Sequence, residues 1–272
     1  MMRKLVWGVA LVAACCAQRA TAQTCTLVIT SPLNFGIYTG AQIRATTPYV
    51  VTCQAKNDGW NFPFNLTGSD TANLRHLAGP GGATLGYAIY RDSAYSQVWG
   101  TGTNEMTGTG STNGTIYAQL NANQTAANGG YSETVTSNTQ SLQLTAQINP
   151  TCSITANPLA FGNYSGALLN GTTTLSVTCT STTFYNVGLN AGTATGATVT
   201  NRMMTGPGGK TLKYSLFSDS GRTTNWGNSS GSWVFGIGTG AAQTLTVYGQ
   251  MPASQNTISG TYTDTIVATV NY

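Results

Sequence analysis

The chain contains two copies of one long unit, and this internal repeat constrains its fold more than any single residue does. Cysteines, an arginine, an aspartate and a Trp-Gly pair recur at an offset of 127 positions. The matching pairs are Cys25 and Cys152, Arg75 and Arg202, Asp92 and Asp219, and Trp99 and Trp226. Two copies of a unit this long indicate two tandem domains, since the repeats of a solenoid are far shorter.

The two copies differ after a matching tyrosine, which is Tyr131 in the first and Tyr262 in the second. In the first copy, apolar and polar residues then alternate over residues 141–148, which predicts a half-buried strand. The apolar positions are Leu142, Leu144, Ala146 and Ile148. We expect this segment to be the final strand of the first domain, supplied by the chain itself.

The second copy has a single alternating run after its tyrosine and then reaches residue 272. The apolar face of this run consists of Ile266, Ala268, Val270 and Tyr272. We expect this run to be the open edge of a domain that lacks its final strand and accepts one from another chain. A donated strand that buries four apolar side chains contributes roughly 6–10 kcal/mol. That contribution is comparable to the stability of a whole domain.

Residues 1–22 have the pattern of a secretory signal peptide. Arg3 and Lys4 form a basic start, an apolar stretch covers residues 5–17, and Ala20-Thr21-Ala22 is a small-residue cleavage site. The stretch is too short for a membrane span. A lipoprotein box that ends at Cys15 is the alternative, in which Cys15 carries a lipid anchor. In either case we expect export to the periplasm and then to the cell surface.

Charge and cysteine content restrict the class of partner and the compartment. Removal of the signal leaves eight of the eleven basic side chains against seven acidic ones, so a nucleic-acid or anionic-membrane partner is not expected. Four cysteines remain, which in an exported protein predict the disulfides Cys25–Cys53 and Cys152–Cys179. A metal site is the weaker alternative, because His76 is the only histidine and no Cys-x-x-Cys is present.

Short alternating runs separated by Gly, Asn and Ser-Gly turns fill both copies, without helical periodicity. Residues 49–53 and 175–179 predict equivalent strands that end at the second cysteine of each copy. Regularly spaced strands over about 120 residues predict an all-β fold with one β-sandwich in each copy. We place the domains at residues 23–149 and 150–272.

Catalytic patterns are lacking in the sequence. The repeated Gly-Pro-Gly-Gly segments lack the Gly-Lys-Ser/Thr end of a phosphate loop and predict tight turns. Asp92 and Asp219 occur in both copies, which favours a role in turns over a catalytic pair. His76 has no counterpart, since Met203 takes its place, and we expect it in a loop. No nucleophile elbow or His-Glu-x-x-His motif is present, so we expect neither an enzyme nor a cofactor.

Aromatic residues of the first copy give the one indication of a binding surface. Trp60 and Phe62 lie in one segment, and Tyr95 and Val98 lie in another whose second-copy counterpart is polar. If these four residues are exposed in loops, we expect them to form a surface-binding tip. The alternative is that Phe62 and the nearby Phe64 are strand residues that face the core, which is the interpretation we favour for Phe64.

In their order along the chain, these motifs resemble the spore coat protein U domain family. The shared pattern is a cysteine followed by Pro-Leu-x-Phe-Gly-x-Tyr, Val-Thr-Cys, Arg-x-(Met/Leu), Leu-x-Tyr, Asp-Ser, Trp-Gly and Gly-x-Tyr-x-Asp-Thr. The second copy matches it along its whole length, and the first has Glu133 in place of the last aspartate. The family is similar to subunits of archaic chaperone–usher pili, whose domains are incomplete immunoglobulin-like sandwiches.

The resemblance implies a periplasmic chaperone, an outer-membrane usher and a sister subunit as partners, with the missing strand lent first by the chaperone and then by the sister subunit. Ordinary subunits carry a donor segment before their first cysteine, and only Gln23-Thr24 would precede Cys25 after cleavage. The resemblance therefore implies a tip adhesin whose first domain binds a host or abiotic surface. A structural spore coat or cell-surface protein without a receptor is the alternative, and an exported enzyme is the least favoured interpretation.

Overall fold

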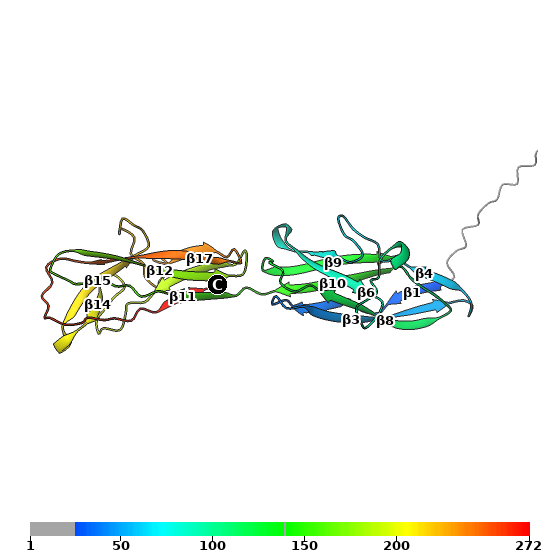
Figure 1. Cartoon of the computed structure of the whole chain (residues 1–272), viewed down its shortest axis with the longest axis horizontal. Helices are drawn as coiled ribbons and strands as arrows, with labels where there is room; N and C mark the ends of the chain where they lie inside the picture. The colour runs from blue at the N-terminus through cyan, green and yellow to red at the C-terminus, as the bar shows by residue number, and fades with distance from the viewer. Residues whose placement is uncertain (1–24, 139) are drawn as a thin grey trace, which may run out of the picture.

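The computed structural model describes residues 25–138 and 140–272, which form two all-β domains (Figure 1). The predicted signal peptide and Cys15 lie outside the described residues. The last strand of the first domain ends at Ile148, and the second domain begins with a strand at Cys152. The described part of the chain contains no helix that is long and apolar enough to cross a membrane.

Most strands of the N-terminal domain form one curled sheet. Among the described residues the strands of the domain are β1 (Cys25–Ile29), β2 (Leu33–Ile37), β3 (Ile43–Cys53), β4 (Gly59–Phe62), β5 (Arg75–Ala78), β6 (Thr84–Tyr90), β7 (Met106–Thr109), β8 (Thr112–Leu120), β9 (Gly129–Ser137) and β10 (Gln140–Ile148). The order in the sheet is β1-β3-β8-β6-β5-β9-β10-β2, and β4 pairs separately with β7. Short 3₁₀ turns lie at Pro80–Gly82 and Gly102–Asn104.

The C-terminal domain repeats this plan with two smaller sheets. In the part of it that the structure describes, the strands are β11 (Cys152–Ala156), β12 (Leu169–Cys179), β13 (Phe184–Leu189), β14 (Arg202–Thr205), β15 (Thr211–Phe217), β16 (Val234–Ile237), β17 (Ala242–Met251) and β18 (Ala268–Asn271). One sheet has the order β11-β12-β17-β15-β14 and the other β16-β13-β18, and a 3₁₀ turn lies at Pro207–Gly209.

The predicted final strand of the first domain is β10, which lies between β9 and β2. Leu144 is opposite Glu133 in the antiparallel pairing with β9 and opposite Leu33 in the parallel pairing with β2. Because successive side chains of a strand point to opposite faces, the alternating sequence directs one apolar row into the core. Leu142, Leu144, Ala146 and Ile148 are all buried.

Repeated residues of the two copies hold equivalent places in the fold. The indole nitrogens of Trp99 and Trp226 donate hydrogen bonds to the carbonyls of Phe62 and Val187, at 2.7 and 2.8 Å. Both predicted disulfides are present, and each joins the first strand of its domain to the end of the long strand beside it: Cys25–Cys53 and Cys152–Cys179.

The turns follow the prediction from their glycines and aspartates. Gly81 and Gly208 both have φ of 62°, a left-handed conformation that favours glycine. The Asp92 carboxylate accepts a hydrogen bond from the Gln97 amide at 2.7 Å. This bond is the main reason that the pKa of Asp92 is lowered. Asp219 makes the equivalent bond in the second domain, so both aspartates have structural roles.

Three expectations from the sequence need correction. Trp60 and Phe62 lie on β4 and are buried, with 7% and 2% of their surfaces exposed, so they are not loop residues of a binding tip. Their rings stack 5.4 Å apart, and the Trp60 indole donates to the Gly110 carbonyl at 2.9 Å. Phe64 is fully buried, in agreement with the prediction that it faces the core.

His76 lies on strand β5 and not in a loop, because it pairs with Gly86 of β6.

The domains lie end to end (Figure 1). A small polar contact joins them beside the linker. The Asn128 backbone amide donates to the Ser181 carbonyl at 3.0 Å. The Asn128 side chain donates to the Thr183 hydroxyl at 2.8 Å. Thr183 is buried, so this contact fixes the entry to β13.

Candidate functional site

An apolar groove opens in the C-terminal domain at the place where the N-terminal domain holds β10. One side of it is the segment 158–164, which matches β2, and the other is the segment 262–268, which matches β9. Two adjoining hollows of about 440 and 700 Å³ share Leu159, Phe161, Met204 and Tyr262 in their walls. The shared walls make the two hollows one continuous groove.

The two sides of the groove lack the strand pairing of their counterparts. In the described part of the second domain, residues 158–164 form no strand, whereas β2 pairs with β10. On the other side, the Thr205 and Thr263 backbones exchange hydrogen bonds of 2.9 and 3.1 Å, and Asn190 donates to the Val267 carbonyl at 3.1 Å. These bonds hold the segment 262–268 on one edge and leave its groove edge unpaired within the described residues.

Matching side chains differ in burial between the two domains. The first-domain residues Leu33, Phe35, Leu77, Tyr131 and Val135 are each at most 5% exposed. Their second-domain counterparts are half-buried: Leu159, Phe161, Met204, Tyr262 and Ile266. Since the residues at all five positions are apolar or aromatic in both domains and the folds match, the missing cover of a strand like β10 accounts for the difference.

The floor of the groove already has the geometry of the closed domain. Phe161 and Tyr214 meet edge to face with ring centres 5.9 Å apart, and Phe35 and Tyr87 do so at 6.1 Å. The Tyr214 hydroxyl donates to Asp264 at 2.7 Å. A site with its walls in place binds without the cost of rebuilding them.

Polar groups beneath the groove fix its edge segment. Burial alone would raise the pKa of the Asp264 carboxyl, but hydrogen bonds from Thr193, Tyr214 and Thr265 outweigh burial, and its pKa is lowered. Burial also lowers the pKa of Arg202 to about 10. The Arg202 guanidinium donates to the carbonyls of Leu189 and Trp226, at 3.0 and 2.7 Å.

The structure agrees with the predicted acceptor edge at its first three residues and differs at the last, Tyr272. Ile266, Ala268 and Val270 point toward the core and are half-buried, but Tyr272 is 61% exposed and does not continue their row. The strand itself is β18, which pairs with β13 with Val270 opposite Val187. Tyr272 lies past the last paired residue of β18, Asn271, and lines a hollow together with Phe184 and Ile237.

The structure also shows an apolar patch that the sequence did not predict. On the outer face of the sheet β16-β13-β18, Phe184, Phe235 and Ile237 are between 51% and 75% exposed around a hollow of about 610 Å³. Phe184 is opposite Ile237, and the matching pair in the first domain is Gly59 and Thr109. The first domain therefore has no such patch at this place.

Of the four candidate surface-binding residues, only Tyr95 and Val98 keep part of their surface exposed. Tyr95 has φ of 57° in its turn, and its ring lies between Tyr90 and Tyr117 at 5.4 and 5.8 Å. The Arg44 guanidinium stacks 4.1 Å above the Tyr95 ring. The result is a partly exposed tyrosine cluster on the first domain.

The fold and the groove define a chain of two tandem immunoglobulin-like sandwiches, of which the first is closed by its own strand. The chain belongs to the Spore Coat Protein U domain family, whose model matches residues 11–138 and 138–269.

Two known proteins illustrate the relationship. The chain is 35% identical over 151 residues to Protein U of Myxococcus xanthus. The matched region covers 49% of this chain and 84% of that protein. It is also similar to a chain of the CsuC–CsuE chaperone–tip adhesion subunit pre-assembly complex from archaic chaperone-usher Csu pili of Acinetobacter baumannii. That likeness has a TM-score of 0.50 at 16% identity and covers 91% of this chain and 100% of the other, so it shows a shared fold.

Proposed function

We propose that this chain is an exported structural subunit of a surface fibre of the archaic chaperone–usher type. Its C-terminal domain accepts a strand from a periplasmic chaperone at first and from a sister subunit afterwards, with an outer-membrane usher as the site of assembly. The observation that carries this proposal is the groove at the place of β10. Its walls match those of a domain that the chain completes itself.

The energetics of the groove favour a protein strand as its occupant. Full burial of a large apolar side chain stabilises by about 1.5–3 kcal/mol, and five half-buried residues line the groove where β10 would lie. A strand also pairs with the free backbone groups of the segment 262–268, which an apolar small molecule does not. Both the apolar walls and the unpaired edge are satisfied by one strand.

The N-terminal domain has the adhesive role in this proposal. Because β10 already fills its groove, this domain accepts no strand and does not serve as a link in a chain of subunits. A subunit with one closed and one accepting domain fits the tip of a fibre. The partly exposed cluster around Tyr95 is the part of the predicted binding surface that remains accessible, so it is the first place to test for contact with a host or abiotic surface.

The strand-accepting role is tested by a graft. Residues 140–148 are appended after Tyr272 through a short glycine–serine linker, and the matched control carries the same graft with Leu142 and Leu144 changed to Asn. We expect the first graft to raise the unfolding midpoint of the C-terminal domain well above that of the control. Equal midpoints for both grafts would mean that the groove does not accept a strand.

A structural coat or cell-surface protein without receptor binding is the second candidate, favoured by the 35% identity to Protein U and by the family itself. Surface attachment of cells that carry Tyr95→Ala distinguishes the two roles, and cells that carry Ser96→Ala are the control. An adhesin loses surface attachment in the first variant while the same amount of protein reaches the cell surface. A coat protein gives unchanged attachment in both variants.

A further inference from the structure

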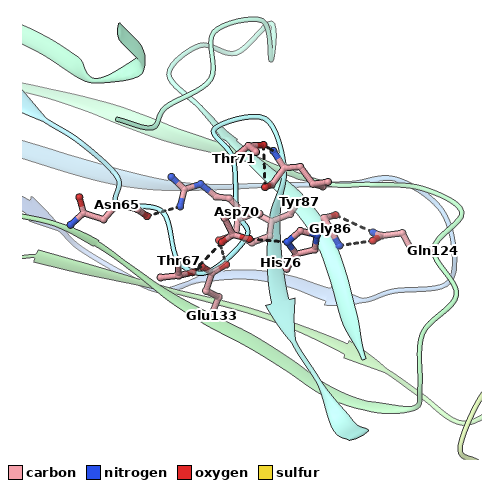
Figure 2. A network of polar contacts seen from close by, with 11 residues as sticks. Asn65, Thr67, Asp70, Thr71, His76, Gly86, Tyr87, Gln124 and Glu133 are labelled. Atoms are coloured by element: carbon pink, nitrogen blue, oxygen red, sulfur yellow. Dashed lines mark hydrogen bonds and ion pairs between the residues drawn. The ribbon is translucent and has the colours of Figure 1, made fainter. Parts of the chain in front are cut away.

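Away from the groove, the N-terminal domain contains a polar network in which one hydroxyl joins two carboxyl groups (Figure 2). Thr67 Oγ1 lies 3.1 Å from Asp70 Oδ2 and 3.0 Å from Glu133 Oε1. A threonine hydroxyl has one hydrogen, so it can donate to only one of these oxygens. With both carboxyls ionised, the other contact would oppose two oxygen atoms without a hydrogen between them. The geometry is satisfied when one carboxyl carries a proton.

The neighbouring groups indicate which carboxyl holds the proton. His76 Nδ1 lies 2.7 Å from Asp70 Oδ1 and can supply a positive charge to it. Glu133 has hydrogen bonds from neutral groups, with the Tyr87 hydroxyl donating to Oε2 at 2.6 Å. The buried Arg75 is nearby, but its guanidinium donates to the carbonyls of Phe64 and Asn65, at 2.8 and 2.9 Å. A protonated Glu133 can donate to Thr67, which then donates to an ionised Asp70.

The second domain provides an internal comparison. Asp264 takes the place of Glu133 and accepts from Thr193 Oγ1 at 2.9 Å and from Tyr214 at 2.7 Å, with no second carboxyl on that threonine. Its pKa is lowered, whereas burial raises the pKa of Glu133 and the charge of Asp70 raises it further. Burial is the main cause of the raised pKa of Glu133 and the Asp70 carboxylate adds to it, whereas Asp264 also accepts backbone hydrogen bonds from Thr193 and Thr265, both at 2.8 Å.

Asn65 is bound to Thr136 of β9 by hydrogen bonds of 2.9 and 3.1 Å. We propose that Glu133 and Asp70 share one proton through Thr67, and that this proton adds a pH-dependent latch between β9 and the rest of the segment 65–74. As the pH rises, Glu133 releases its proton to solvent, and the like charges of the two carboxylates separate the segment from the strand. The charged and titratable groups that act on Glu133 are Asp70, Arg75 and Tyr87, and His76 lies against Asp70. The latch lies on the strand that also pairs with β10, since Glu133 is opposite Leu144.

The composition of the chain allows a direct test. Its only glutamates are Glu105 and Glu133, so carbon-13 labelling of glutamate gives two side-chain carboxyl signals, which Glu133→Gln assigns. We expect the Glu133 signal of the full mature chain to titrate at a higher pH than that of an ordinary glutamate. Asp70→Asn should lower its midpoint, because the second carboxyl is removed. An unchanged midpoint in Asp70→Asn would overturn the shared proton.

The latch itself is tested by hydrogen exchange of residues 65–74, corrected for the intrinsic effect of pH. We expect protection of this segment to fall several-fold above the Glu133 midpoint in the natural sequence. In Glu133→Gln, whose amide can still donate to Thr67, protection should not change across that pH. His76→Gln removes the imidazole beside Asp70 and should leave the fall in place. Protection that is equal on both sides of the midpoint would refute the latch.

Discussion

Phe35 and Phe161 have matching places in the two domains, and their different burial predicts different costs for the same substitution. Phe35 lies on β2 next to β10 and is 5% exposed, whereas Phe161 is half-buried beside the open groove. Removal of a buried phenylalanine side chain costs about 3–5 kcal/mol, and we expect Phe35→Ala to show that full cost. Part of the Phe161 ring is already in water, so Phe161→Ala should cost about half as much.

Scanning calorimetry of the mature chain measures both costs, because each substitution shifts the transition of its own domain. At roughly 4 °C per kcal/mol for domains of this size, Phe35→Ala should lower one midpoint by roughly 12–20 °C. Phe161→Ala should lower the other by roughly 6–10 °C. In the chain grafted with residues 140–148, the two shifts should become equal. Equal shifts in the ungrafted chain would refute the argument that the groove is open.

Other predictions concern the closing strand, the buried carboxyls and the domain contact. Leu144→Ala should destabilise the N-terminal domain by about 2–5 kcal/mol in urea unfolding, while the C-terminal transition stays in place. The raised pKa of Glu133 favours its protonated form in the folded state, so its contribution to stability is lost as the pH rises through the folded pKa. The lowered pKa of Asp264 gives the opposite sign, with stability lost as the pH falls through the folded pKa. Unfolding midpoints measured from below pH 3.8, the ordinary pKa of an aspartate, up to neutral pH should therefore diverge between the domains, and curves that stay parallel over this whole range would contradict both assignments. Asn128→Ala should remove about 1 kcal/mol of hydrogen bonding to Thr183 and increase independent domain motion in NMR relaxation, with little change in either midpoint.

The repeat and the strand periodicity were enough to predict the features that depend on local sequence. The alternation of Leu142, Leu144, Ala146 and Ile148 indicates one buried face, and β10 has that face. One cysteine pair in each copy of an exported chain predicts both disulfides, and in the structure each pair joins two neighbouring strands. The Gly-Pro-Gly-Gly segments predict turns, because only glycine favours the positive φ found at Gly81 and Gly208.

Features that depend on contacts between distant segments could not be predicted in the same way. Trp60 and Phe62 look like loop aromatics until the pairing of β4 with β7 shows which face is buried. Thr67 and Glu133 are 66 residues apart and meet only when β9 lies against the segment before β5. The outer patch needs β13 and β16 in register, since Phe184 and Ile237 come together across that pairing.

The position of the Cys152–Cys179 disulfide has a mechanical consequence. Tension applied through the linker reaches the C-terminal domain at Cys152, the first residue of β11, and an antiparallel pair pulled from one end opens one rung at a time. The disulfide lies at that first rung. It transfers the load covalently to β12, which pairs with β17 from Leu169 to Thr178. Force then acts along a long ladder in shear, so the domain resists extension more strongly than its edge strand alone would.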